Sequence, residues 1–154
     1  MLMTGAKAPL FTLMDSGGKP LSLDDFRGKK VVVYFYPKDD TPGCTVEACS
    51  FRDVYDEILA AGAVVLGISP DGQASHESFR DKYGLPFHLL SDTEHYVAEQ
   101  YGAWGKTGLH GANGSGIVRC TFVVDADGFI SHVFPLVTPD DHAVEVLLAL
   151  NAPN

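Results

Sequence analysis

Two short, uninterrupted hydrophobic runs constrain the fold of this chain more than any other feature. Residues 31–36 read VVVYFY, and residues 63–68 read AVVLGI. Runs of this length, rich in β-branched and aromatic residues and without polar alternation, are typical of strands buried on both faces. A sheet with such central strands needs helices packed against both sides, which predicts an α/β fold.

The segment between these two runs has the signals of a long helix. Thr41 is a suitable N-cap and Pro42 a suitable first helical residue, while Gly62 is a natural C-terminal stop. Helical spacing predicts a single apolar face. Its members are Phe51, Val54, Tyr55, Ile58 and Leu59.

The rest of the chain continues the alternation and then closes with a hairpin and a helix. The predicted helices are residues 74–83 and 93–101, the second capped by Ser91 or Asp92, and the predicted strands are residues 87–90, 118–124 and 129–134. Residues 125–128 (DADG) give a hairpin turn signal between the last two strands. The final helix is predicted to start at Thr138-Pro139 and to bury Val144, Leu147 and Leu148.

No internal repeat, low-complexity tract or linker divides the sequence, so we expect residues 1–154 to form a single domain. The order of elements is that expected of a thioredoxin-like sandwich, an α/β fold with a central mixed β-sheet flanked by helices. The glycine-rich stretch at residues 102–116 has no periodicity and is predicted to be a mobile surface loop.

Net charge and hydropathy limit the kinds of partner and the cellular compartment that we expect for this chain. The formal net charge of −9 disfavours nucleic acid or an anionic membrane as a partner. No window has the length of a transmembrane helix, and residues 1–19 lack the apolar core of a signal peptide. We therefore expect a cytoplasmic protein whose three cysteines are reduced at rest.

Cys44 occupies a chemically special position at the start of the predicted helix, directly after a strand and a short loop. Unpaired backbone N–H groups and the positive end of the helix dipole favour the thiolate there. Position alone leaves a second reading open, in which Cys44 is a small buried hydrophobe.

The residues around Cys44 carry a family resemblance. The segment Pro37-Lys-Asp-Asp-Thr41-Pro-Gly-Cys44 resembles the active-site motif of peroxiredoxins. The flanking segments are similar to the Q-type (bacterioferritin-comigratory) branch of that family. They are residues 6–13, 28–37, 45–49, 85–92 and 116–125. Residues 105–114 depart from this branch, which leaves the substrate preference open.

The resemblance implies a role for each residue of the motif. Cys44 would be the peroxidatic cysteine, Thr41 would hydrogen-bond the peroxide, and Pro37 would shield the thiolate from water. Arg119 would be the cation beside the thiolate. Because Arg119 lies inside an apolar run at residues 117–124, an unpaired arginine there would be costly, which favours the functional role over that of a surface charge.

The other two cysteines differ in the role that we expect. Cys49 would be the resolving cysteine of the Q-type branch. Inside an intact helix, however, its Cα would lie roughly 8 to 9 Å from that of Cys44, too far for a disulfide. The pair therefore requires the first helical turns to unwind. Cys120 follows Arg119 in a strand and should point to the opposite face, as a packed core residue.

The resemblance implies a thiol peroxidase that reduces hydrogen peroxide and organic hydroperoxides, with a thioredoxin-like protein as reductant. We expect a monomer or weak dimer. Two other classes stay open, a thioredoxin-like dithiol oxidoreductase or redox sensor and a non-catalytic thioredoxin-fold module. The spacing of the cysteines and histidines does not match a zinc site, and no phosphate-binding glycine loop is present, so we expect neither metal nor cofactor. The pair Asp39-Asp40 is predicted to be solvated.

Overall fold

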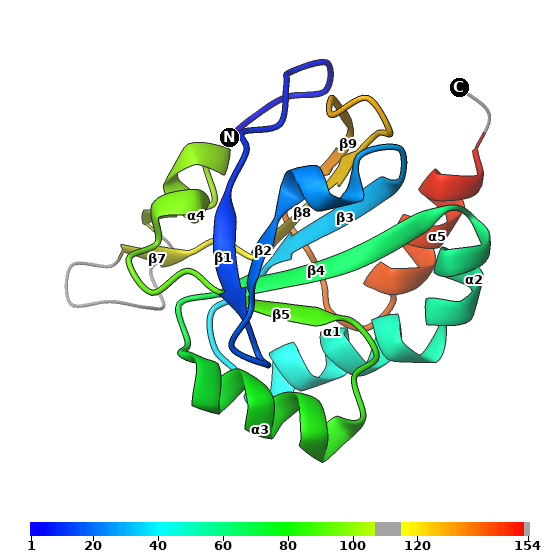
Figure 1. The fold of residues 1–154 in the computed structure, drawn as a ribbon. Helices are drawn as coiled ribbons and strands as arrows, with labels where there is room; N and C mark the ends of the chain where they lie inside the picture. Colours follow the sequence, from blue (N-terminus) through cyan, green and yellow to red (C-terminus); the bar gives the residue numbers. More distant parts are fainter. Residues whose placement is uncertain (107–114, 153–154) are drawn as a thin grey trace.

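A seven-stranded mixed sheet forms the centre of the computed structural model, which describes residues 1–106 and 115–152 (Figure 1). Its strand order is β2-β1-β5-β4-β3-β8-β9, in which β3, β4 and β5 run parallel and the other neighbours run antiparallel. The strands are β1 (Thr12–Asp15), β2 (Pro20–Ser22), β3 (Lys30–Phe35), β4 (Ala63–Ser69), β5 (His88–Ser91), β8 (Cys120–Val124) and β9 (Ile130–Phe134).

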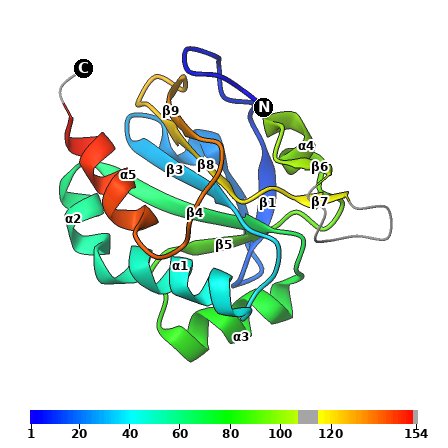
Figure 2. The same cartoon turned by 180° about the vertical axis from the view of Figure 1, so that it is seen from behind.

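Helices cover the two faces of this sheet unequally. Four of them pack on one face: α1 (Pro42–Asp53), α2 (Tyr55–Ala60), α3 (Gln73–Tyr83) and α5 (His142–Asn151). Figure 2 shows these four from behind, on the same side of the sheet. The other face is covered by α4 (Tyr96–Tyr101), the 3-10 helix η1 (Leu23–Phe26) and the N-terminal segment. The predicted α/β class with a mixed sheet flanked by helices is confirmed.

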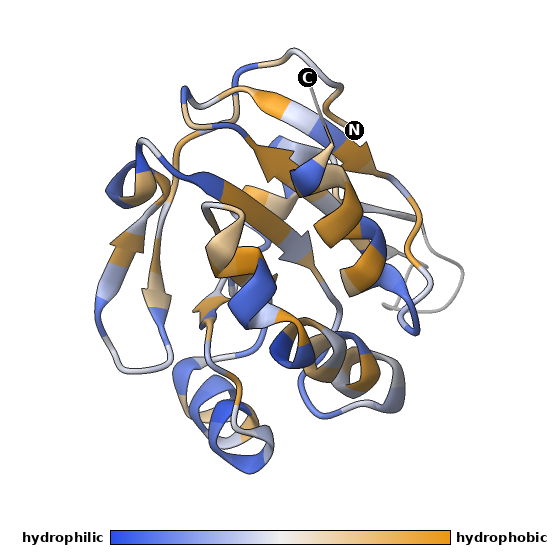
Figure 3. Cartoon of the chain, turned by 90° about the vertical axis from the view of Figure 1, so that its right-hand side faces the viewer, coloured by the Kyte–Doolittle hydropathy of each residue, from blue (hydrophilic) through white to orange (hydrophobic). Residues whose placement is uncertain are grey.

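The central strand β3 explains why its sequence is hydrophobic without alternation. Val32 and Tyr34 point into the cluster beneath α1 and α3, whereas Val31, Val33 and Phe35 point into the cluster beneath α4. All five are at most 2% exposed. Figure 3 shows the result as hydrophobic strands at the centre of the molecule, with hydrophilic segments at the periphery. The run at residues 31–36 is thus buried on both faces, as predicted.

The predicted long helix is interrupted at Val54. This residue leaves helical geometry (φ −115°, ψ 13°), so that α1 ends at Asp53 and α2 begins at Tyr55. The predicted apolar face is therefore only partly right. Phe51, Tyr55 and Ile58 are buried, but Leu59, which lies beyond the break, is 47% exposed.

Two further predictions are corrected by the positions of elements. The last helix begins at His142 rather than Pro139. Its buried face is formed by His142, Ala143, Val146 and Leu150. Of the residues predicted to be buried, Val144 and Leu148 are exposed and Leu147 is partly buried. The predicted loop at residues 102–116 is wrong at its ends, where β6 (Trp104–Lys106) pairs with β7 (Ser115–Ile117). Residues 107–114 lie outside the described residues.

The helix predicted at residues 93–101 begins later, at Tyr96, and its N-cap residue is His95 rather than Ser91 or Asp92. Asp92 nevertheless contacts the first turn of this helix. The Asp92 carboxylate accepts the backbone N–H groups of Val97 and Ala98, at 3.2 and 2.9 Å. Within residues 1–106 and 115–152, no helix is both long and apolar enough to span a bilayer.

Candidate active site

Cys44 lies in the first turn of α1, just beyond the carboxyl end of β3, and its side chain is buried. Thr41 is the N-cap residue and Pro42 the first helical residue, as predicted. The Thr41 hydroxyl does not cap the helix, however, because it donates to the Lys38 carbonyl at 2.9 Å. The N–H groups of the first turn consequently have no capping side chain, and they are aligned with the positive end of the helix dipole beside the sulfur.

Arg119 is in direct contact with Cys44. Its Nη2 donates to Sγ at 3.2 Å. The sheet brings the two together, because β8 is the antiparallel neighbour of β3 and Cys120 pairs with Phe35 at the carboxyl end of β3. Arg119 lies immediately before β8, so its side chain extends over the end of β3 toward α1. A cation at this distance favours the negative charge of a thiolate.

Glu47 is a member of the site that the sequence analysis missed. Its Oε1 accepts Arg119 Nη1 at 2.7 Å, and its side chain is fully buried. Burial raises the pKa of Glu47 to about 7, against the opposing effect of the Arg119 charge. The available signal was its spacing, because a residue three positions after Cys44 shares its helical face. Glu47 orients the guanidinium. When the Glu47 carboxyl is ionised, its negative charge offsets part of the positive charge of Arg119 beside the sulfur.

Gly43 makes room for this arrangement. A Cβ atom at this position would lie 3.3 Å from Arg119 Nη2 and 3.7 Å from Pro139 Cγ. A larger residue would therefore push against the guanidinium. The other two predicted site residues, Pro37 and Thr41, are half-buried in the loop between β3 and α1.

Cys49 lies on the same helix as Cys44, and its side chain is half-buried. Both thiols are free. Because both residues lie within the continuous helix α1, the rise and rotation of five residues separate their Cα atoms by roughly 8 to 9 Å. A disulfide between them requires the helix to change.

Cys120 lies on the opposite face of the sheet from Cys44. It packs with Phe122 and Val124 in the cluster beneath α4, as predicted. Burial, with a smaller contribution from the charge of Glu47, raises the pKa of Cys120 to about 12. This thiol therefore stays protonated at neutral pH.

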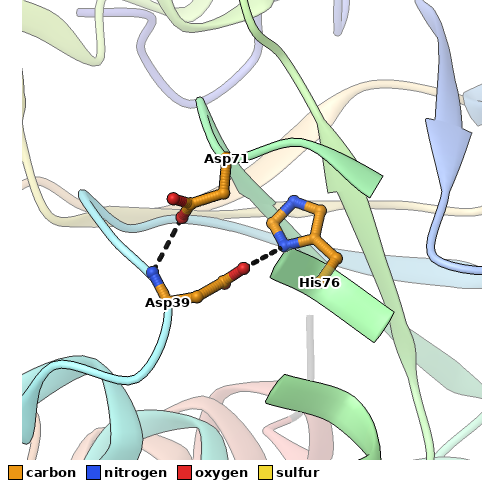
Figure 4. A group of neighbouring side chains, drawn as sticks. All are labelled: Asp39, Asp71 and His76. Carbon is orange, nitrogen blue, oxygen red and sulfur yellow. Dashed lines mark hydrogen bonds and ion pairs between the residues drawn. The ribbon is translucent and has the colours of Figure 1, made fainter. Parts of the chain in front are cut away.

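Asp39 is buried, and the prediction that it is solvated is wrong. Its carboxylate accepts hydrogen bonds from Tyr36 Oη at 2.6 Å, Ser75 Oγ at 2.8 Å and His76 Nδ1 at 2.7 Å. Its backbone N–H donates to Asp71 Oδ2 at 2.7 Å (Figure 4). The reason is tertiary, since the partners are the residue directly after β3, residues of α3 and Asp71 in the loop between β4 and α3.

Asp39, Asp71 and His76 also have the residue types of a metal site, and their ligand atoms lie within 4.8 Å of one another. The atoms that face each other are already engaged, however. Asp71 Oδ2 accepts the Asp39 N–H and the Ser69 hydroxyl, and Asp39 Oδ2 accepts from Ser75 and His76. We therefore assign this group a structural role.

Comparison with known proteins gives a consistent family. The family model described as the AhpC/TSA family matches residues 4–133. The bcp-type peroxiredoxin of Coxiella burnetii is 55% identical over 143 residues, which cover 93% of this chain and 95% of that protein. Peroxiredoxin Bcp of Escherichia coli is 48% identical over 146 residues, which cover 95% of this chain and 94% of that protein.

A solved structure supports the same grouping. The bacterioferritin comigratory protein of Xanthomonas campestris, studied for its alkyl peroxide reduction activity, superposes with a TM-score of 0.85 and 35% identity over 91% of this chain and 89% of that chain. Together with the thioredoxin-like sheet and the cysteine, arginine and threonine of the motif, these matches show that the chain belongs to the AhpC/TSA family and, within it, to the Bcp or Q-type peroxiredoxins, and that it is a thiol peroxidase.

Proposed function

We propose that Cys44 is the peroxidatic residue and that it reduces hydrogen peroxide and organic hydroperoxides. The Cys44 thiolate attacks one oxygen of the O–O bond. That bond breaks, the sulfur becomes a sulfenic acid, and the departing oxygen takes a proton and leaves as water or an alcohol. The observation that carries the proposal is the 3.2 Å contact between Arg119 Nη2 and Cys44 Sγ at the start of a helix.

Arg119 has two tasks in this step. It stabilises the attacking thiolate and then the negative charge that develops on the departing oxygen. Glu47 holds the guanidinium in place through Oε1. The Thr41 hydroxyl, half-buried and now bonded to the Lys38 carbonyl, can turn to the peroxide, and Pro37 limits the access of water.

Cys49 resolves the sulfenic acid in a second step. Its thiol displaces the hydroxyl of Cys44 as water, and a Cys44–Cys49 disulfide forms. Because an intact α1 keeps the two residues too far apart, the start of the helix unwinds first. An external dithiol protein of the thioredoxin type then reduces the disulfide by thiol exchange, which would place the cycle in a reducing compartment such as the cytoplasm. Sulfur carries both electrons, so the chemistry needs no metal or organic cofactor.

The test is turnover with a defined reductant. Wild-type protein should consume hydroperoxide in the presence of reduced thioredoxin, with one disulfide of thioredoxin formed for each peroxide lost. A dithiol oxidoreductase without peroxidase activity would leave both the peroxide and the reduced thioredoxin unconsumed.

Cys49→Ser separates the two steps. The variant should reduce one equivalent of peroxide and then stall as a sulfenic acid that excess peroxide oxidises further. Its matched control is Ser50→Ala, which changes the neighbouring half-buried hydroxyl without removing a thiol. If peptide mapping of oxidised wild type found Cys44 bonded to Cys120 or to another chain, the resolving role of Cys49 would be wrong.

A further inference from the structure

The loop between β3 and α1 is attached to the rest of the protein very differently on its two sides. On the side of α3 it is held by side chains of two adjacent residues, Asp39 and Asp40. On the side of α1 the first helical turn is held by the Arg119–Cys44 contact and by the first helical hydrogen bond, from Thr45 N–H to the Thr41 carbonyl. Only the second set involves the reacting sulfur.

Asp39 makes the inner attachment. Besides its three side-chain donors, it donates its own N–H to Asp71 (Figure 4). His76 Nε2 lies 3.0 Å from the Leu90 carbonyl, which can only accept, so this nitrogen carries a proton. Its Nδ1 lies 2.7 Å from the Asp39 carboxyl group, which also accepts hydrogen bonds from two hydroxyl groups, and both side chains are buried. Separating these groups leaves several buried polar atoms without partners, so this attachment opens rarely.

Asp40 makes the outer attachment. Its φ of +57° lies in the left-handed region, which Asp and Asn adopt more readily than other non-glycine residues. Two residues at the end of α3 hold its side chain. Lys82 Nζ donates to Asp40 Oδ2 at 2.7 Å, and Tyr83 Oη donates to Oδ1 at 2.8 Å. Inner and outer contacts therefore bind two consecutive residues of the loop to the same helix.

Oxidation affects only one of the two sides. A sulfenic acid lacks the thiolate charge, so its hydrogen bond from Arg119 is weaker than that of the reduced sulfur. None of the contacts of Asp39 and Asp40 involves Cys44. The change in free energy on oxidation thus acts on the helical side of Thr41 and leaves the α3 side unchanged.

From this asymmetry we propose that Asp39 and Asp40 form a fixed clamp on α3, and that the opening of α1 is hinged at Thr41, directly after the clamp. The proposal rests on the proposed Cys44–Cys49 disulfide and assigns Asp39 and Asp40 as positioning residues for its formation. With the loop held at residue 40, Cys44 moves on a tether of four residues. The effective concentration of its sulfenic acid near Cys49 stays high for that reason.

Residue-resolved amide exchange, measured on the reduced protein and on protein oxidised with one equivalent of hydrogen peroxide, tests the clamp. Peptide mapping first establishes whether the Cys44–Cys49 disulfide is present. We expect the amides of residues 45–48 to exchange at least about tenfold faster after oxidation, while the Asp39 amide changes by less than about twofold. Equal acceleration at Asp39 would overturn the clamp alone, and absence of the disulfide would overturn both the clamp and the proposed function.

Two variants weaken the clamp separately. Ser75→Ala removes one inner donor, and Asp40→Asn removes the outer charge while keeping a residue type that tolerates positive φ. In the oxidised protein Ser75→Ala should speed exchange at Asp39 about tenfold, the effect of a lost hydrogen bond to a charged group. Asp40→Asn should do so by a smaller factor, because its contacts are exposed to solvent. The control is Asp24→Asn, which removes an exposed carboxylate paired with Arg27, far from the loop.

A kinetic readout separates positioning from general stabilisation. Each variant should slow disulfide formation severalfold and leave the first reaction with peroxide within about twofold of wild type, since the loosened tether lowers the effective concentration. An unchanged rate of disulfide formation in both variants would overturn the positioning role. So would a first reaction with peroxide that slows by the same factor as disulfide formation, because that pattern marks a residue that only stabilises the fold.

Discussion

Cys44 and Cys120 are two cysteines buried on opposite faces of one sheet, and almost everything except burial distinguishes them. Both are at most 1% exposed. Cys44 lies at a helix start in contact with Arg119, whereas Cys120 lies among apolar side chains that raise its pKa to about 12. Exposure therefore does not distinguish the two thiols, whereas the neighbouring charge and the free backbone N–H groups do.

The strongest test of this contrast between Cys44 and Cys120 is to remove each thiol in turn. Cys44→Ser should abolish peroxide consumption, because the only thiolate in the charged site is lost. Cys120→Ser replaces a packed thiol by a similar-sized group on the far face, so its rate of peroxide consumption should stay close to wild type. Stopped-flow measurement of peroxide loss checks both, and substantial turnover by the Cys44 variant would show that the assignment is wrong.

Removing the cation should make Cys44 more like Cys120. Arg119→Met keeps the bulk of the side chain but not its charge or its donors. We expect the second-order rate constant with peroxide to fall by about a hundredfold, the usual effect of losing one donor to developing charge. Arg119→Lys is the matched control and should recover part of the rate through its charge, but not the contact to Glu47. A rate equal to wild type in the methionine variant would exclude the electrostatic role.

The ionisation of Glu47, which lies on the Cys44 side of the sheet, should make the free energy of unfolding depend on pH. Its pKa of about 7 in the folded chain lies above its usual value of 4.5, so the unfolded chain releases this proton first as the pH rises. The stability contributed by the neutral carboxyl is present below pH 4.5 and is lost as the pH rises to about 7. The loss in free energy of unfolding is about 3 kcal/mol at most.

Urea unfolding at pH 4.5 and pH 7.5 measures this effect. In Glu47→Gln the corresponding fall in the free energy of unfolding should disappear, because an amide does not titrate. Glu57→Gln is the control, since this carboxylate on α2 is exposed. Equal pH dependence in wild type and Glu47→Gln would show that Glu47 is ionised throughout this range.

Alkylation of the native protein compares the three thiols without any substitution, and it should change the protein least. Iodoacetamide at neutral pH should modify Cys44 and, more slowly, the half-buried Cys49, while Cys120 reacts only after denaturation. Mass spectrometry of peptides over time distinguishes the three sites. Modification of Cys120 in folded protein at a rate near that of Cys44 would contradict the contrast.

The sequence alone predicts the central part of the fold well. The unbroken run at residues 31–36 indicates a doubly buried strand, and Thr41-Pro42 marks the start of α1, because both signals are local. The errors fall where tertiary packing decides. Nothing in the local sequence separates Val54 from its helical neighbours, and the buried face of α5 depends on where the helix starts.

The candidate site also contains residues that a local motif predicts and residues that only tertiary contacts reveal. Cys44, Thr41 and Pro37 follow from one continuous motif, and Arg119 follows from its family resemblance and from its place in an apolar run. Glu47 was missed because its role depends on a contact with a residue 72 positions away. Asp39 was misread for a similar reason, since a carboxylate in a loop is normally solvated and only the position of His76 makes it a buried one.

Under the proposed mechanism, in which part of α1 unwinds in each cycle, the interruption at Val54 has a kinetic consequence. Helix α1 contains 12 residues and ends there, so a segment of this size or smaller has to re-form after each reduction while α2 keeps its place on β4. A peptide of this length forms a helix in about a microsecond or less. Rewinding is therefore far faster than any bimolecular encounter with the reductant at cellular concentration, and the throughput of the cycle is set by collision and bond exchange rather than by folding.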